Sequence, residues 1–177
     1  MIQTSPKLTI ADFGPNRDHV AESYHGGKVF AMLHRSDLVR RYLPNVVFDA
    51  ADDYLYVFVH GAQSEALFDN DEQWVPREIP VDLVTDFLQA IYGSSLSGLR
   101  IRLASCYGNL VRPGEPESLA MRFAKAISAT SIEAYAGLVT IVGQPRRIEL
   151  GSSVMWDASL QIAVSTGLTG SWDLVVP

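Results

Sequence analysis

Two short strand-like segments, each followed by a polar residue, constrain the fold of this chain most strongly. Residues 55–59 read LYVFV and run directly into His60 and Gly61. Residues 99–104 read LRIRLA and run into Ser105 and Cys106. The continuous apolar character of residues 55–59 is typical of a strand that is covered on both faces of a parallel sheet. We therefore expect two buried strands that end at His60 and at Cys106.

Helical patterns connect and follow these strands. Residues 79–93 read IPVDLVTDFLQAIYG, with proline near the start, two aspartates early and glycine after the end, which predicts a helix. Residues 115–127 read EPESLAMRFAKAI and predict a second helix with one apolar side. Residues 131–142 predict a third strand. Strands that alternate with helices indicate an α/β fold with a mainly parallel sheet and right-handed crossovers.

The two ends of the chain are less regular. Residues 28–43 have apolar positions at helical spacing, so a helix that Pro44 ends is expected there. Residues 7–13 alternate like a short strand, and residues 14–27 are rich in turn-forming and polar residues. The tail predicts short strands over 146–151, 159–165 and 171–177, forming a hairpin at the edge of the sheet or against it. No internal repeat is visible, so residues 1–177 are expected to form a single domain.

Composition excludes some partners. The net charge of -6 argues against a broad phosphate-binding surface, and nucleic acid is therefore not an expected ligand. No apolar run approaches the roughly 18 residues of a membrane span, and the N-terminus has no signal-peptide pattern. We expect a protein without a membrane span that is soluble, either cytoplasmic or exported as part of a larger protein.

The chain has one cysteine, Cys106, so neither an internal disulfide nor a cysteine-rich zinc site can form. The histidines do not have metal-ligand spacing with a third ligand, so no metal or cofactor is expected. His60 and Cys106 end two strands that a single helix joins. If these strands are neighbours in a parallel sheet, both residues lie at the same edge, with Cα atoms about 5 Å apart.

The chemistry of this pair suits nucleophilic catalysis. A thiol is only slightly ionised at neutral pH, and a neighbouring imidazole can lower its pKa or accept its proton during attack. Gly61 has no side chain to block a substrate carbonyl. The backbone N–H groups of Gly61 and Cys106 are candidates for an oxyanion site.

The order of the two residues separates the possible folds. All four histidines, His19, His25, His34 and His60, precede Cys106. An α/β-hydrolase and a papain-like peptidase both place the histidine after the nucleophile. A histidine about 50 residues before the cysteine is instead the caspase order.

Residues 55–142 resemble the core of caspase-like, clan CD cysteine peptidases. The resemblance rests on VFVHG, then IRLASCYG 46 residues later, then SLAMRFAKAI and the ending GSWDLVVP. These segments are especially similar to caspase-like domains of bacterial polymorphic toxins. The resemblance implies a three-layer sandwich, with helices on both faces of a mainly parallel sheet and a C-terminal hairpin. It also implies a dyad in which Cys106 is the nucleophile and His60 transfers the proton.

Three functions follow from these observations. The first is a cysteine peptidase whose thiolate attacks a peptide carbonyl and which processes the larger toxin or effector that carries it. Tyr107 stands where caspases have arginine, so cleavage after aspartate is not implied. The second is a catalytically silent caspase-like module that binds a partner. The third is a Cys-dependent hydrolase or acyl transferase that acts on something other than a peptide.

Overall fold

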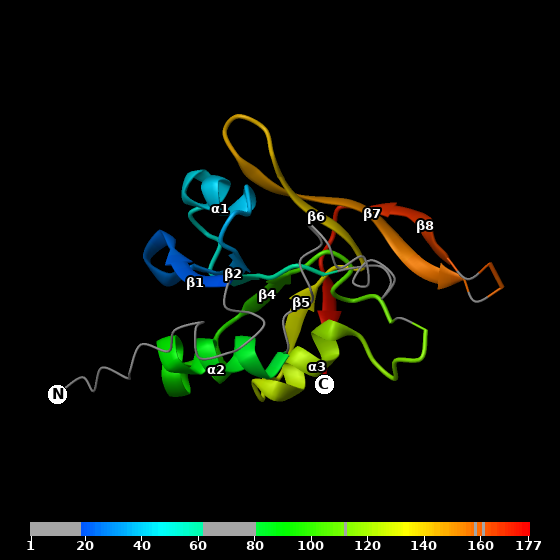
Figure 1. Cartoon of the computed structure of the whole chain (residues 1–177), viewed down its shortest axis with the longest axis horizontal. Coiled ribbons are helices and arrows are strands. Elements are labelled where there is room, and N and C mark those ends of the chain that lie inside the picture. The colour runs from blue at the N-terminus through cyan, green and yellow to red at the C-terminus, as the bar shows by residue number, and fades with distance from the viewer. Residues whose placement is uncertain (1–18, 62–80, 112, 158, 161) are drawn as a thin grey trace.

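A six-stranded sheet lies at the centre of the molecule, between two helices and a smaller antiparallel sheet (Figure 1). The structure is a computed structural model that describes residues 19–61 and 81–177, except residues 112, 158 and 161. The strand order is β1-β2-β3-β4-β5-β9. These strands are His19–Tyr24 (β1), Val29–His34 (β2), Leu55–Phe58 (β3), Ile101–Ala104 (β4), Ile132–Ala134 (β5) and Asp173–Val175 (β9).

The four inner strands, β2 to β5, are parallel, and the two edge strands are antiparallel to their neighbours. The strands predicted from residues 55–59 and 99–104 are confirmed as β3 and β4. They are adjacent, with Phe58 paired to Ala104. Their carboxyl ends therefore meet at one edge of the sheet.

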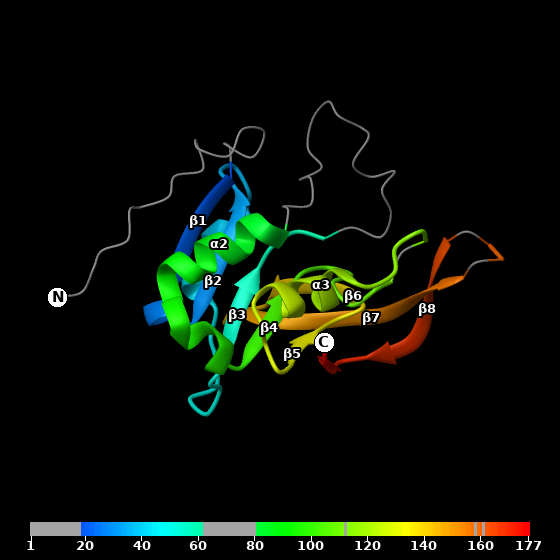
Figure 2. The same cartoon turned by 90° about the horizontal axis from the view of Figure 1, so that it is seen from below.

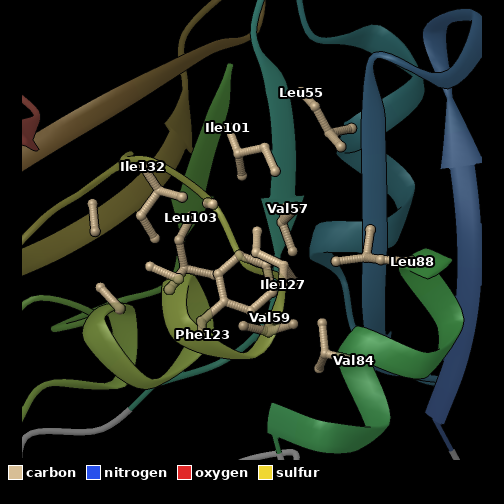
Figure 3. Close-up of a cluster of buried hydrophobic side chains, with 14 of the residues drawn as sticks. Leu55, Val57, Val59, Val84, Leu88, Ile101, Leu103, Phe123, Ile127 and Ile132 are labelled. Atoms are coloured by element: carbon tan, nitrogen blue, oxygen red, sulfur yellow. The ribbon is translucent and has the colours of Figure 1, made fainter. Parts of the chain in front are cut away.

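The two long helices cover one face of this sheet. They are α2 (Val81–Tyr92) and α3 (Leu119–Ala126), which confirms both helices expected between and after the strands (Figure 2). Successive residues of a strand point to opposite faces, so alternate side chains of β3 and β4 enter this core. Figure 3 shows this core, in which the helix residues Val84, Leu88 and Phe123 meet side chains of the strands, namely Leu55, Val57, Ile101, Leu103 and Ile132.

A three-stranded antiparallel sheet covers the opposite face. It consists of β6 (Gly137–Val142), β7 (Arg147–Asp157) and β8 (Ile162–Thr169), in the order β6-β7-β8. Its half-buried residues Val139, Ile141 and Ile148 pack on a buried cluster that includes Tyr56, Phe58 and Ala104. The expectation of helices on both faces is therefore corrected. The only α-helix above this face among the described residues is α1, the single turn Val39–Tyr42 (Figure 1).

Three further expectations are corrected. Residues 28–43 do not form one helix, because the apolar run from Val29 to Leu33 is completely buried and pairs with β1 and β3 as a strand. The segment 14–27, expected as turns, contains β1. The strand expected over 131–142 is two strands in different sheets, since the chain leaves β5 before Gly137 and starts β6. The strand expected over residues 7–13 lies outside the described residues.

Candidate active site

His60 and Cys106 lie together at the carboxyl edge of the parallel sheet. Each follows by two residues the paired positions Phe58 and Ala104, so they leave adjacent strands at the same level. The side chains of Phe58 and Ala104 face the antiparallel sheet. The structure thus brings together the two residues that the sequence singled out.

Gly61 lies against the backbone of Cys106. A Cβ atom added to Gly61 would overlap the carbonyl oxygen of Cys106 and would lie 2.5 Å from Oγ of Ser105. Any side chain at position 61 would therefore separate the two strand ends. Ser105 itself is fully buried, and its hydroxyl group has no hydrogen-bond partner. The glycine is required here by close approach of two backbones, not by an unusual φ angle.

A third residue, Asp37, joins the site from the neighbouring strand. Asp37 follows β2, which is parallel to β3, so it reaches the same sheet edge as His60. The Nε2–H group of His60 donates a hydrogen bond to Oδ2 of Asp37, and the two side chains are only 29% and 14% exposed. Because Nε2 is the donor, the other ring nitrogen, Nδ1, is left with a lone pair in the neutral imidazole. Asp37 thereby fixes which nitrogen of His60 can act as a base.

The surroundings of Asp37 keep it ionised. Burial raises the pKa of this carboxyl group, but the hydrogen bonds from His60 and from the backbone N–H of Val39 outweigh burial, so the pKa is lowered overall. Val39, whose N–H donates this 2.8 Å bond, is the first residue of α1. Sequence reasoning missed Asp37 because it assigned this segment to a helix. An aspartate two residues before a helical turn and just after an apolar strand was the available signal.

The thiol of Cys106 is held by the edge of β6. Sγ accepts a hydrogen bond from the backbone N–H of Val139 (3.4 Å) and donates one to the carbonyl oxygen of the same residue (3.5 Å). Burial raises the pKa of this thiol, although the bond from Val139 lowers it in part. Among the described residues no hydrogen bond joins Cys106 to His60. The raised pKa favours the neutral thiol over the thiolate.

The loop after Cys106 is fixed by backbone hydrogen bonds. Tyr107, which has a φ of 57°, donates its N–H to Gly137 at 2.8 Å. Asn109 donates its N–H to Tyr135 at 3.0 Å. These bonds tie the loop to the connection between β5 and β6. The position of Cys106 thus depends on both sheets.

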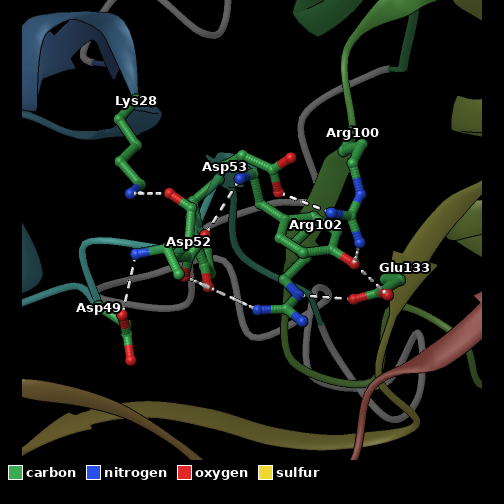
Figure 4. Close-up of polar contacts among 10 residues, drawn as sticks. Lys28, Asp49, Asp52, Asp53, Arg100, Arg102 and Glu133 are labelled. Atoms are coloured by element: carbon green, nitrogen blue, oxygen red, sulfur yellow. Dashed lines mark hydrogen bonds and ion pairs between the residues drawn. The ribbon is translucent and has the colours of Figure 1, made fainter.

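The opposite edge of the sheet carries a polar cluster of a different kind (Figure 4). Arg102 donates to Glu133 at 2.6 Å and to the hydroxyl of Tyr56 at 2.7 Å, and its guanidinium group lies 3.8 Å from the centre of the Tyr54 ring. An open groove of about 400 Å³ lies beside it and is lined in part by Arg100, Tyr54 and Glu133. These charged groups are already paired, since Arg100 binds Asp53 and Arg102 binds Glu133.

Comparisons with protein-family models, with curated proteins and with solved structures find no match to this chain. In the described part of the chain, no helix is long and apolar enough to cross a membrane. Over the same residues, no three histidine, cysteine, aspartate or glutamate side chains are grouped so that they could hold a metal ion.

Proposed function

We propose that this chain is a caspase-like cysteine peptidase in which Cys106 is the nucleophile and His60 is the general base. The observation that carries the proposal is the convergence of Asp37, His60 and Cys106 at the carboxyl ends of three adjacent parallel strands. Such sheet edges are the usual place for ligands and reacting groups in α/β proteins. A nucleophile, a base and a group that orients the base are the parts that nucleophilic catalysis needs.

The neutral thiol favours a mechanism in which the proton moves during attack. Nδ1 of His60 accepts the thiol proton as Sγ of Cys106 bonds to the substrate carbonyl carbon. Asp37 stabilises the imidazolium that results, because its carboxylate already binds Nε2–H. His60 then returns the proton to the leaving amine, and water hydrolyses the acyl-enzyme. The N–H groups of Gly61 and Cys106 are the proposed donors to the oxyanion.

Attack requires the thiol to leave Val139. Both hydrogen bonds of Sγ to this residue must break before the sulfur can approach a carbonyl carbon beside His60. A peptide that displaces this edge of β6 would release the thiol. The natural substrate would be a peptide or protein, and a segment of the larger toxin or effector that carries the chain is the substrate we propose.

The test compares peptide cleavage with thiol alkylation in the same variants. Wild type, Cys106→Ala, His60→Ala and the control His34→Gln are incubated with a peptide library, and products are identified by mass spectrometry. We expect wild type and His34→Gln to cleave, Cys106→Ala to be inactive, and His60→Ala to be slower by about 10²-fold or more. Iodoacetamide labelling of Cys106 is followed against pH in each variant that retains the thiol.

The buried thiol favours one alternative, a catalytically silent module that binds a partner through the same edge. In that case no peptide is cleaved, and His60→Ala leaves the labelling of Cys106 unchanged. If His60→Ala does slow labelling but no peptide is cleaved, the function is instead a Cys-dependent hydrolase or acyl transferase acting on another substrate. Either result would end the peptidase proposal.

A further inference from the structure

Ser105, the residue before Cys106, carries a hydroxyl group that the proposed mechanism does not use. Its side chain is fully buried, and Oγ has no hydrogen-bond partner among the described residues. A buried hydroxyl group without a partner destabilises the form of the protein in which it occurs, whereas alanine would fill much the same space without this cost. A second form of the site, in which the hydroxyl group has a partner, would account for the serine.

Oγ of Ser105 lies beside the backbone groups that build the site. A Cβ atom added to Gly61 would lie 2.5 Å from Oγ and would overlap the carbonyl oxygen of Cys106. The two oxygen atoms are therefore neighbours at the end of β3. A rotation of the peptide group that follows Cys106 would bring its carbonyl oxygen within reach of the hydroxyl group.

Strand β6 holds residues 105–107 in their present form. The thiol of Cys106 exchanges hydrogen bonds with Val139, and Tyr107 donates its N–H to Gly137, the first residue of β6. Tyr107 has a φ of 57°, which is unfavourable for a residue with a bulky side chain. An unpaired hydroxyl group and a left-handed tyrosine thus flank the thiol while β6 holds it. Strain of this kind is typical of sites that have two alternative forms.

We propose that Ser105 is a positioning residue for Cys106. In a second form of the site the thiol has left Val139, and the hydroxyl group of Ser105 donates a hydrogen bond to the carbonyl oxygen of Cys106. Because the same hydroxyl group is unpaired while β6 holds the thiol, serine at this position shifts the equilibrium toward the released thiol. That the released thiol then cleaves a peptide rests on the proposed function, whereas the equilibrium itself does not.

The test compares Ser105→Ala with Thr85→Val in the full chain. Thr85 on α2 is 6% exposed, and its hydroxyl group likewise has no partner among the described residues. Both substitutions remove an unpaired hydroxyl group, but only Ser105 adjoins Cys106, so Thr85→Val is the matched control. Urea unfolding gives the stability of each variant, and iodoacetamide labelling at pH 7.5 gives the accessibility of the thiol. Cleavage of one peptide from the library gives kcat/KM.

We expect both variants to unfold at a higher urea concentration than wild type. Only Ser105→Ala should label Cys106 more slowly, by about tenfold or more, because it loses the hydrogen bond that favours the released form. Its kcat/KM should fall by a similar factor, since the reactive form is less populated. A merely structural role for Ser105 would change stability without slowing either reaction.

Three results would overturn the proposal: labelling of Ser105→Ala at the wild-type rate, its unfolding at a lower urea concentration than wild type, or equal slowing of labelling in Thr85→Val. If wild type cleaves no peptide but labelling behaves as expected, the proposed function fails and the role of Ser105 stands. If wild type and Ser105→Ala cleave with equal kcat/KM, the peptidase stands and the role of Ser105 fails.

Discussion

At the scale of single residues, Gly61 is the position where the smallest change has a large expected effect. Gly61→Ala places a Cβ atom into the carbonyl oxygen of Cys106, a backbone atom that cannot move without shifting a strand end. Overpacking of this kind costs about 1–3 kcal/mol of the free energy of unfolding. Urea unfolding of Gly61→Ala should show this loss. Gly98→Ala is the control, because a Cβ at Gly98 meets no atom within 4 Å and should change stability little.

Asp37 should make stability depend on pH. The pKa of its carboxyl group is lowered in the folded protein, so its contribution is present above the unfolded pKa of about 3.9 and is lost as pH falls through the lower, folded value. Asp37→Asn should therefore lower the free energy of unfolding at pH 7 by about 1–2 kcal/mol and have a smaller effect near pH 3. Urea unfolding at both pH values measures this. The exposed Asp49→Asn should show no such difference; an equal loss at both pH values would contradict an ionic role for Asp37.

At the scale of secondary-structure elements, the sequence predicted the helices and strands whose hydrophobic pattern matches their burial in the structure. Strands β3 and β4 and helices α2 and α3 were found because their apolar runs are continuous or one-sided. The segment from Val29 to Leu33 was mistaken for a helix because its apolar residues are followed by Leu38 and Leu43 at helical spacing. The segment from Val29 to Leu33 forms a strand because its side chains are buried on both faces of the sheet. This burial comes from neighbours that are distant in the sequence. The sequence does not predict Asp37 as a site residue because it does not predict the strand that Asp37 follows. It does predict His60 and Cys106 because it predicts the strands that precede them.

The ion pair between β4 and β5 should contribute to stability. Arg102 on β4 is 20% exposed and binds Glu133 on β5. Arg102→Ala removes the cation from a partly buried carboxylate that keeps its hydrogen bond from Tyr54, which should cost about 1–2 kcal/mol in urea unfolding. Arg100→Ala is the matched control on the same strand end: its pair with Asp53 is exposed, and solvent screening should leave stability nearly unchanged. Equal losses in the two variants would mean that burial of the pair does not matter.

At the scale of the whole molecule, the two sheets meet at Cys106. Cys106 follows the six-stranded sheet, but its thiol is bonded to Val139 of the antiparallel sheet. No sequence pattern reveals this contact, because the two residues are 33 positions apart and lie in different sheets. Access to the thiol is therefore expected to depend on how firmly the smaller sheet packs on the larger one.

Loosening that packing should expose the thiol. Ile141 on β6 is half-buried against the cluster that includes Tyr56 and Phe58. Ile141→Ala removes part of this contact and so destabilises the form in which the two sheets are packed together. A loss of about 1.4 kcal/mol in that packing corresponds to about tenfold faster alkylation of Cys106. Leu138→Ala is the control, because Leu138 lies on the same strand and is 47% exposed, so its removal should leave the rate unchanged. Iodoacetamide labelling at pH 7.5, followed by mass spectrometry, gives both rates. If the two variants label at the wild-type rate, opening between the sheets does not control access to Cys106, and the thiol must reach solvent by movement of its own loop.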